Sequence, residues 1–475
     1  MKLSALKVLS EDEIKQIHEA TMHILGSCGV KVHSPRMLEF LKGKGLDVDL
    51  GSSVVRFSRA SLEDALASAP PTFDVFNRDG EFAFTMGDGV PKVAAGHNAV
   101  FWLDSDTGET RTSKVTDVEL FAKICEQLPN IDVMGIPVMP QDMPDASSSL
   151  LFAVRACIEN TRKPIYFSTD RADVTRDCIK LLRAGFAGDF DSQVYGICQL
   201  SPTSPLYWEE TVINAIMDTL ETGVPLVVLP EPIAGHSAPY TLAGLLTMDN
   251  AECLSGLAMI QMLKPGAKVM YANSWTTTDM RTGMALVGSA ETTLCRIAAA
   301  QMAKYYKIPS HTTAPNSDNH AHDEQNAWEK TLSQFCSLGA GHDLIVNCGM
   351  FATGMTCSHE QLIMDEEISA MSRRITRGIA VSDETIARDL IEEVGPQGES
   401  YMTTDHTMTR LRSDEYHVPN IAVRGPVASW QTAGAKDSAQ LAKEKAGDYA
   451  KNAVPQIDPA RKAAMDEIVR SFSDK

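Results

Sequence analysis

Hydrophobic and polar positions follow a mixed pattern over the first part of the chain. Ser10 and Glu13 fit a capping box, and apolar residues from Ile14 onward recur at helical spacing. The same reasoning predicts a second helix and two short strands, over residues 36–43, 54–57 and 73–76 respectively. Residues 1–115 are therefore predicted to form an α+β extension.

From residue 116 onward, short apolar runs alternate with segments of helical period. The runs cover residues 133–138, 164–167, 194–200, 225–229, 268–272, 308–312 and 344–346. Strands that alternate with long helices pair in parallel. This many units in about 230 residues fits a TIM (β/α)8 barrel better than an open doubly wound sheet. No G-x-G-x-x-G motif follows an early strand, which weakens a dinucleotide-binding alternative. The predicted barrel spans residues 116–425.

The last segment, residues 426–475, is less apolar than the rest. Residues 443–451 are charged and helix-prone, and residues 459–472 predict a short helix with proline at its start. We expect a C-terminal helical arm that packs on the barrel or forms an oligomer contact.

Charge and cysteine usage narrow the class of protein. The net charge is −19. Because phosphate binding needs clustered lysine and arginine, this charge disfavours nucleic acid or an anionic membrane as the main partner. The 10 cysteines form no C-x-x-C pair, which is typical of reduced core residues. The chain begins without the apolar core of a signal peptide, and no apolar run is long enough to span a membrane. We expect a cytoplasmic protein.

In a TIM barrel the active site lies at the carboxyl ends of the strands, so the residues after each apolar run are the candidates. These loops are rich in glycine and small polar residues, with isolated aromatics, as in residues 230–239, 273–281 and 347–356. They indicate a ligand cavity lined by hydroxyls and amides rather than an acid–base pair. A serine hydrolase and a P-loop enzyme are poorly supported, because neither G-x-S-x-G nor a P-loop motif occurs.

Metal binding has one candidate motif. His320 and His322 form an H-x-H pair of the kind that binds zinc. They lie in a polar segment where the next helix is expected to begin, and no other cysteine or histidine has matching spacing. We expect structural or solvent-facing roles for both residues and no bound metal.

Several short motifs follow one another along nearly the whole chain. They are Leu9-Ser10-Glu11-Asp12-Glu13-Ile14, Val55-Arg56-Phe57, Ala65–Pro71, Asn77-Arg78-Asp79, Pro225–Gly244, Asp279-Met280-Arg281-Thr282-Gly283, Gln301-Met302-Ala303 and Gly395–Thr407. Through these motifs the chain resembles the trimethylamine methyltransferase family. Some members of that family carry pyrrolysine after the seventh strand. The corresponding loop is residues 351–358, where Thr356 occupies the pyrrolysine position, so the resemblance points to the non-pyrrolysine branch.

That branch implies a methyltransferase for quaternary amines. The implied reaction moves a methyl group from glycine betaine, the favoured substrate, to Co(I) of a corrinoid protein or to free cob(I)alamin, and releases dimethylglycine. Proline betaine, carnitine and γ-butyrobetaine are alternative substrates. The resemblance implies no permanently bound cofactor; the partners would be the small amine and the corrinoid protein, and we expect a homo-oligomer. A non-catalytic betaine-binding barrel and a metal-dependent hydrolase using His320 and His322 are alternatives from other classes.

A quaternary ammonium leaves as a neutral tertiary amine, so a general acid or zinc has little to do. Catalysis then consists mostly of positioning the methyl group and excluding water. The cationic head needs aromatic faces, for which Tyr271, Trp275 and Phe351 are the candidates near strand ends. Trp275 is preferred, and Trp275→Ala is expected to raise the KM for a betaine without unfolding the protein. For each of these aromatics, plain core or rim packing is the competing interpretation.

Charged and polar groups complete the predicted site. Glu231 would balance the cation, although a loop or helix-cap role also fits it. The substrate carboxylate needs hydrogen-bond donors, and the candidates are His97, Arg281, His311, Asn316 and Asn347. His97 precedes the predicted barrel and would reach over its mouth; a buried structural histidine is an equal alternative there.

Overall fold

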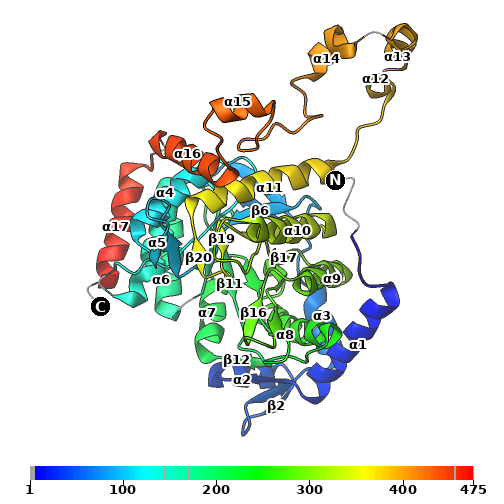
Figure 1. Ribbon diagram of the computed structural model, residues 1–475. Coiled ribbons are helices and arrows are strands. Elements are labelled where there is room, and N and C mark those ends of the chain that lie inside the picture. Colours follow the sequence, from blue (N-terminus) through cyan, green and yellow to red (C-terminus); the bar gives the residue numbers. More distant parts are fainter. Residues whose placement is uncertain (1–5, 144, 170, 399, 454–455, 474–475) are drawn as a thin grey trace.

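In the computed structural model, which describes residues 6–143, 145–169, 171–398, 400–453 and 456–473, eight parallel strands form a closed barrel (Figure 1). In chain order they are β6 (Lys92–Ala95), β9 (Met134–Gly135), β10 (Ile165–Ser168), β11 (Gly196–Leu200), β13 (Leu226–Val228), β14 (Val269–Asn273), β17 (Ser310–Thr313) and β18 (Leu344–Cys348). Strand β18 pairs with β6, and a parallel bridge between Ala94 and Val133 closes the ring. The predicted (β/α)8 fold is confirmed.

Each of the predicted apolar runs overlaps a barrel strand, but the first strand of the barrel, β6, was not among them. Its residues 92–95 lie inside the segment predicted as the extension, so the boundary between residues 115 and 116 falls too late. The reason is physical: β6 is short and buried along its whole length, so it shows neither alternation nor a long apolar run.

Helices surround the barrel. They are α4 (Val115–Cys125), α5 (Ser149–Asn160), α6 (Ala172–Gly185), α7 (Glu210–Leu220), α8 (Leu242–Leu263), α9 (Ala290–Tyr306), α10 (Glu324–Ala340) and α11 (His359–Arg377). Side chains of each strand alternate between two cores. Met270 and Ala272 of β14 belong to the core inside the barrel, whereas Val269 and Tyr271 belong to the core between the barrel and the helices.

The N-terminal residues pack on the outside of the barrel. Helix α1 (Glu11–Ser27) begins with the predicted capping box of Ser10 and Glu13 and packs against α8, as does α3 (Arg59–Ala67). Helix α2 (Pro35–Gly43) is also as predicted. A small sheet has the order β12 (Tyr207–Trp208), β1 (Val30–Val32), β3 (Val54–Arg56), β2 (Asp47–Asp49).

One end of the barrel is closed by the hairpin of β4 (Phe73–Phe76) and β5 (Phe82–Met86). Phe73, Val75, Phe84 and Met86 join the core inside the barrel. Val75 bridges to Val194, which precedes β11, so the hairpin lies at the amino ends of the strands. The hairpin therefore covers the amino ends of the strands and leaves the carboxyl ends as the side from which a ligand would enter.

Short strands stand around that open end. The sheet of β7 (Phe101–Leu103), β8 (Thr110–Thr112), β19 (Met350–Phe351) and β20 (Thr356–Cys357) follows β6 and β18, and the hairpin of β15 (Thr277–Asp279) and β16 (Met284–Leu286) follows β14.

No helix in the described part of the chain is long and apolar enough to cross a lipid bilayer.

The C-terminal helices cover other barrel helices. Helix α16 (Ser438–Lys451) packs against α11 and α4, and α17 (Pro459–Ser473) packs against α6 and α5. These helices confirm and extend the predicted ones, and they cover the chain's own barrel. The predicted end of the barrel at residue 425 is wrong, because its last helix, α11, ends at Arg377.

After α11 the chain leaves the barrel and later returns. The intervening elements are short: α12 (Asp383–Ile386), α13 (Arg388–Val394), η2 (Gly395–Gln397), η3 (Tyr401–Thr403), α14 (Asp405–Arg410) and α15 (Val427–Thr432); a further single turn, η1 (Ala146–Ser148), precedes α5. Figure 1 shows α12, α13 and α14 far from the barrel helices.

Candidate active site

Aromatic and polar side chains from three strands and from the loop after β6 meet at the open end of the barrel. The Tyr166 hydroxyl of β10 lies 2.9 Å from Oε1 of Gln199 on β11 and 3.0 Å from Nε2 of His311 on β17. The rings of Tyr166 and His311 stack with centroids 5.4 Å apart. His97, which follows β6, presents its ring to Tyr166 with centroids 5.0 Å apart. Strand alternation turns Tyr166, Gln199 and His311 inward.

The two imidazoles of this cluster are neutral. Burial lowers the pKa of His97 to about 4 and holds the pKa of His311 well below its usual range. Nδ1 of both rings has no hydrogen-bond partner among the described residues. Burial also raises the pKa of Tyr166, so its hydroxyl keeps its proton. The cluster offers neutral donors and acceptors but no charged acid or base at neutral pH.

One carboxylate stands beside the cluster. Glu231 follows β13, and its side chain is exposed. Desolvation by the surrounding protein raises the pKa of its carboxyl, and a hydrogen bond from Ser274 opposes this shift. The Glu231 side chain is thus reached by solvent although protein atoms surround its carboxyl. The charge of Glu231 helps to raise the pKa of Tyr166, which places the two groups in one neighbourhood. We call His97, Tyr166, Gln199, Glu231 and His311 the barrel recess.

Amides and hydroxyls continue around the carboxyl ends of the strands. Gln199 donates from Nε2 to the Ser201 hydroxyl over 3.2 Å, and the hydroxyls of Ser274 and Thr313 lie 3.4 Å apart. Asn347 donates from Nδ2 to Oδ1 of Asn316 over 2.9 Å. Within the described residues, no lysine or arginine hydrogen-bonds to a side chain of the barrel recess. Among the five residues of the barrel recess, Glu231 alone can carry a formal charge at neutral pH, and that charge is negative, so the recess suits a cation.

The structure therefore brings together three of the predicted site residues, His97, Glu231 and His311. Asn316 and Asn347 pair with each other at the ends of β17 and β18. The sequence interpretation missed Tyr166 and Gln199. A signal was present, because a polar residue inside an otherwise apolar buried strand, such as Gln199 in Gly196–Leu200, needs a polar environment.

The aromatic cage predicted from Tyr271, Trp275 and Phe351 is not formed at the barrel recess. Tyr271 points outward from β14, and its hydroxyl donates to Asn250 of α8 over 2.9 Å. Trp275 is 1% exposed and belongs to the same outer core, so its ring faces are covered by protein. Phe351 is also 1% exposed, and its ring contacts His322. Strand alternation and loop packing decide these orientations, and residue type does not reveal them.

Two further candidates lie away from the recess. The Arg281 side chain is 91% exposed at the β15–β16 hairpin and pairs with Asp279 over 3.2 Å, so it does not face the cluster. Thr356 is buried in β20, where it pairs with Phe351 and Phe101. Its equivalence to the pyrrolysine position stays a prediction.

The H-x-H pair does not assemble a ligand set. His320 is exposed, whereas His322 lies 3.1 Å from the Ser358 hydroxyl through Nε2. Across the described ranges of the chain, no three histidine, cysteine or acidic side chains are placed to hold a metal ion.

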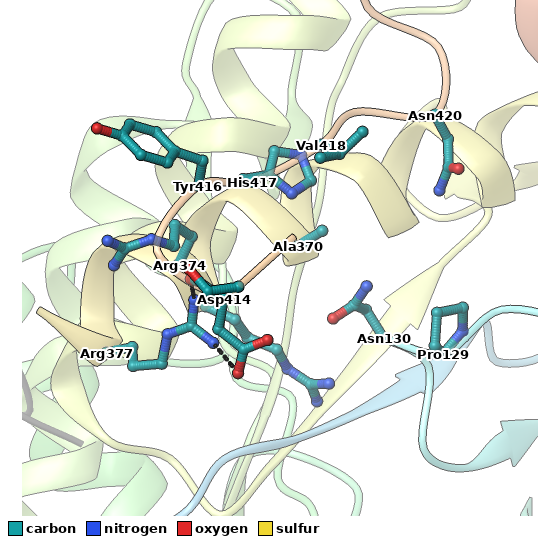
Figure 2. Close-up of a pocket in the computed structure, with 12 residues that line it drawn as sticks. Pro129, Asn130, Ala370, Arg374, Arg377, Asp414, Tyr416, His417, Val418 and Asn420 are labelled. Carbon is teal, nitrogen blue, oxygen red and sulfur yellow. Dashed lines mark hydrogen bonds and ion pairs between the residues drawn. The ribbon is translucent and has the colours of Figure 1, made fainter. Parts of the chain in front are cut away.

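A separate cavity of about 470 Å³ lies beside the last turns of α11 and is lined by Arg373, Arg374 and Arg377 (Figure 2). Its charges are already paired: Arg377 with Asp414 at 3.2 Å, Arg374 with Glu415 at 3.6 Å, and Arg373 with Asp132. Each of these three arginines already has an acidic partner, so none offers an unpaired charge to a ligand. The barrel recess is therefore the stronger candidate site.

Comparison with known proteins agrees with the sequence motifs. The family model described as trimethylamine methyltransferase (MTTB) matches residues 1–472. The chain belongs to the trimethylamine methyltransferase family. Its relatives include trimethylamine methyltransferase MttB2 of Methanosarcina mazei, 32% identical with 99% of this chain and 96% of that protein covered.

Two other relatives of the family are named for different substrates. Trimethylamine methyltransferase MttB of Desulfitobacterium hafniense is 30% identical, with 98% of this chain and 94% of that protein covered. The glycine betaine methyltransferase of the same species is 27% identical, with 99% and 97% covered. Among solved structures, the monomethylamine methyltransferase MtmB of Methanosarcina barkeri matches with a TM-score of 0.53 at 11% identity, covering 98% of this chain and 88% of that one. This last likeness shows the barrel fold alone.

Proposed function

We propose that this methyltransferase moves a methyl group from a quaternary amine, with glycine betaine the favoured substrate, to Co(I) of a corrinoid protein, and releases dimethylglycine. The observation that carries the proposal is the Glu231 carboxylate in a recess that otherwise holds neutral groups. A carboxylate attracts an ammonium more strongly where water is partly excluded, and neutral imidazoles do not repel it. The recess is therefore suited to a permanent cation.

The proposed chemistry matches the absence of a charged acid among the groups of the barrel recess. When the C–N bond breaks, both electrons stay on nitrogen, and the Co(I) electron pair forms the new bond to the methyl carbon. The amine leaves neutral and needs no proton. The work left for Tyr166, His311 and Glu231 is to orient the ammonium and hold it away from water.

The other end of a betaine is an anion and needs donors. A neutral imidazole donates through whichever ring nitrogen carries the proton, and Nδ1 of His97 has no partner within the described chain. The His97 ring contacts the ring of Tyr166, which in turn stacks on His311. We assign His97 to the substrate carboxylate and Glu231 to the ammonium.

The methyl acceptor must reach the open end of the barrel. Exposed apolar side chains stand there on the loops that follow β13, β14 and β18; they are Tyr240, Met280, Met284 and Met355. Flexible methionine-rich surfaces adapt to protein partners. They support docking of a corrinoid protein over the recess.

The direct test combines purified protein, a reduced corrinoid protein and glycine betaine. Methylcobalamin absorbance and dimethylglycine are expected, and Glu231→Gln should be the less active variant. Parallel reactions with proline betaine, carnitine, γ-butyrobetaine and trimethylamine identify the substrate. Transfer from trimethylamine alone would overturn the quaternary-amine assignment. Saturable betaine binding in calorimetry without transfer from any compound would show a non-catalytic binding barrel instead.

A further inference from the structure

Asn347 stands at an irregularity in β18, the last strand of the barrel. The register of β18 against β6 shifts between Val346 and Cys348, so Asn347 is the extra residue of a β-bulge. Its backbone φ is +132°, a value that residues other than glycine rarely adopt. Bulges next to active sites re-aim a side chain, and such a backbone persists only where neighbouring groups hold it. The contacts that hold Asn347 therefore bear on its function.

Hydrogen bonds fix the orientation of the Asn347 carboxamide. Asn316 donates from Nδ2 to the Thr313 carbonyl over 3.1 Å, and a carbonyl can only accept. Oδ1 of Asn316 is therefore the atom that faces Asn347, which presents its own Nδ2 to it at 2.9 Å. Oδ1 of Asn347 accepts no hydrogen bond among the described residues, and solvent reaches it, since Asn347 is 8% exposed. Asn347 thus presents a free carbonyl oxygen at the rim of the barrel.

Polar contacts connect this asparagine pair to Glu231. The Ser274 hydroxyl bonds to the Glu231 carboxyl and lies 3.4 Å from the Thr313 hydroxyl. The carbonyl of the same threonine orients Asn316, and through it Asn347. Glu231 and Asn347 therefore belong to one polar rim at the carboxyl ends of β13, β14, β17 and β18. Both side chains offer oxygen atoms, which suit a cation.

A buried ion pair holds the two loops that carry the asparagines. Lys330 of α10 and Asp365 of α11 pair at 2.8 Å, and both side chains are 0% exposed. Lys330 also donates to the carbonyl of Pro315, the residue before Asn316, over 3.2 Å. Asp365 accepts from the backbone N–H of Gly349, just after the bulge, over 2.7 Å. The ion pair thus sets the spacing between the loops after β17 and β18.

We propose that Asn347 determines the preference for a cationic substrate: its Oδ1 contacts the N-methyl groups of the bound quaternary ammonium. Lys330 and Asp365 are positioning residues that act through the two loops. The methyl groups of a quaternary ammonium carry part of its positive charge, so their C–H groups are attracted to a carbonyl oxygen. The proposal rests on the proposed function for the identity of the ligand as a quaternary amine, and it assigns Asn347 to the ammonium instead of the carboxylate.

The first test is the binding of three ligands, measured by calorimetry. Glycine betaine and tetramethylammonium share the cationic head, whereas 3,3-dimethylbutanoate keeps the carboxylate of the betaine and has a neutral carbon in place of its nitrogen. Asn347→Gly suits the positive φ and removes the carboxamide. It should weaken both cations roughly 5- to 10-fold and change the Kd of 3,3-dimethylbutanoate less than about 2-fold. Asn316→Leu, which removes the group that orients Asn347, should give the same selective loss.

The outcomes of this test separate two failures. Unchanged binding of both cations to Asn347→Gly, or equal weakening of all three ligands, would overturn the role of Asn347 and leave the proposed function intact. An unaltered protein that binds neither cation would overturn the proposed function, and the role of Asn347 with it. Circular dichroism checks that each variant is folded.

The second test separates positioning from stability. Lys330→Met/Asp365→Leu removes the ion pair together with its contacts to both loops, and should lose the preference for cations as Asn347→Gly does. The matched control is Gln334→Leu, which removes a buried hydrogen bond to Ser369, 2.9 Å long, between the same two helices. Gln334 has no hydrogen bond to either loop within the described chain, so the control should keep the preference. A folded ion-pair variant with unaltered preference, or a control that loses it equally, would overturn the positioning role.

Discussion

The Tyr166 hydroxyl lies 3.0 Å from Nε2 of His311, and the two rings are nearly parallel, at 12°. Since that hydroxyl donates to Gln199, the His311 ring carries its proton on Nε2 and leaves Nδ1 as an acceptor. One phenol thus fixes the tautomer of a buried imidazole at the base of the barrel recess. This relationship gives the first prediction.

Tyr166→Phe removes the hydroxyl and keeps the ring. His311 and Gln199 then lose a buried partner, so the free energy of unfolding should fall by about 1–3 kcal/mol. The value of kcat/KM should fall roughly 10-fold, because the imidazole is no longer oriented. Thermal unfolding and initial rates measure the two effects separately. Unchanged values for both would show that the hydroxyl orients nothing.

Glu231→Gln keeps the size of the side chain and removes its charge. The KM for the quaternary amine should rise roughly 10- to 100-fold, since a hydrogen bond or contact with a charged partner contributes about 1.5–3 kcal/mol. The structural reason is that the carboxylate meets the ammonium in a partly desolvated recess. The conservative variant Glu231→Asp, which keeps the charge, should recover part of the affinity.

The pH dependence of the same residue gives a second readout. Burial raises the pKa of Glu231, whereas a quaternary ammonium does not titrate. As the pH falls through that raised pKa, the carboxyl gains a proton, loses its charge and binds the cation less well. The unaltered enzyme should therefore lose kcat/KM on the acid side, and Glu231→Gln should lack this limb. An identical limb in both proteins would assign the titration to another group.

Trp275→Ala should act on stability. The indole is 1% exposed within the outer core, and removing a buried tryptophan costs about 3–5 kcal/mol of unfolding free energy. This replaces the expectation that the variant only raises KM. Trp275→Phe is the matched control and should lose less stability. A stable Trp275→Ala protein with a much higher KM would restore the cage interpretation.

Lys330 and Asp365 form an ion pair at 2.8 Å in which both side chains are 0% exposed. Lys330→Met leaves the buried carboxylate without its cation and should reduce the free energy of unfolding by about 3–5 kcal/mol. The double variant Lys330→Met/Asp365→Leu removes both charges and should recover much of that loss. Because Asp365 also accepts from the backbone of Gly349 after β18, denaturant unfolding should be measured beside activity.

The sequence by itself determined the fold class. Alternating apolar runs and helical periods are local patterns, and parallel strands joined by helices have few ways to close. Family motifs spread along the chain then determined the family. Glu231 and His311 could also be predicted as site residues from the sequence, because each occupies or follows the carboxyl end of a predicted strand.

Tertiary structure alone decided which side chains face the recess. A shift of one residue along a strand turns a side chain to the opposite face, so Tyr166 points into the barrel and Tyr271 away from it although both lie in apolar runs. It also decided that β6 is a barrel strand, since pairing with β18 is a long-range contact without a local signal. Composition showed polar loops; only the closed barrel brought His97, Tyr166 and Glu231 to one place.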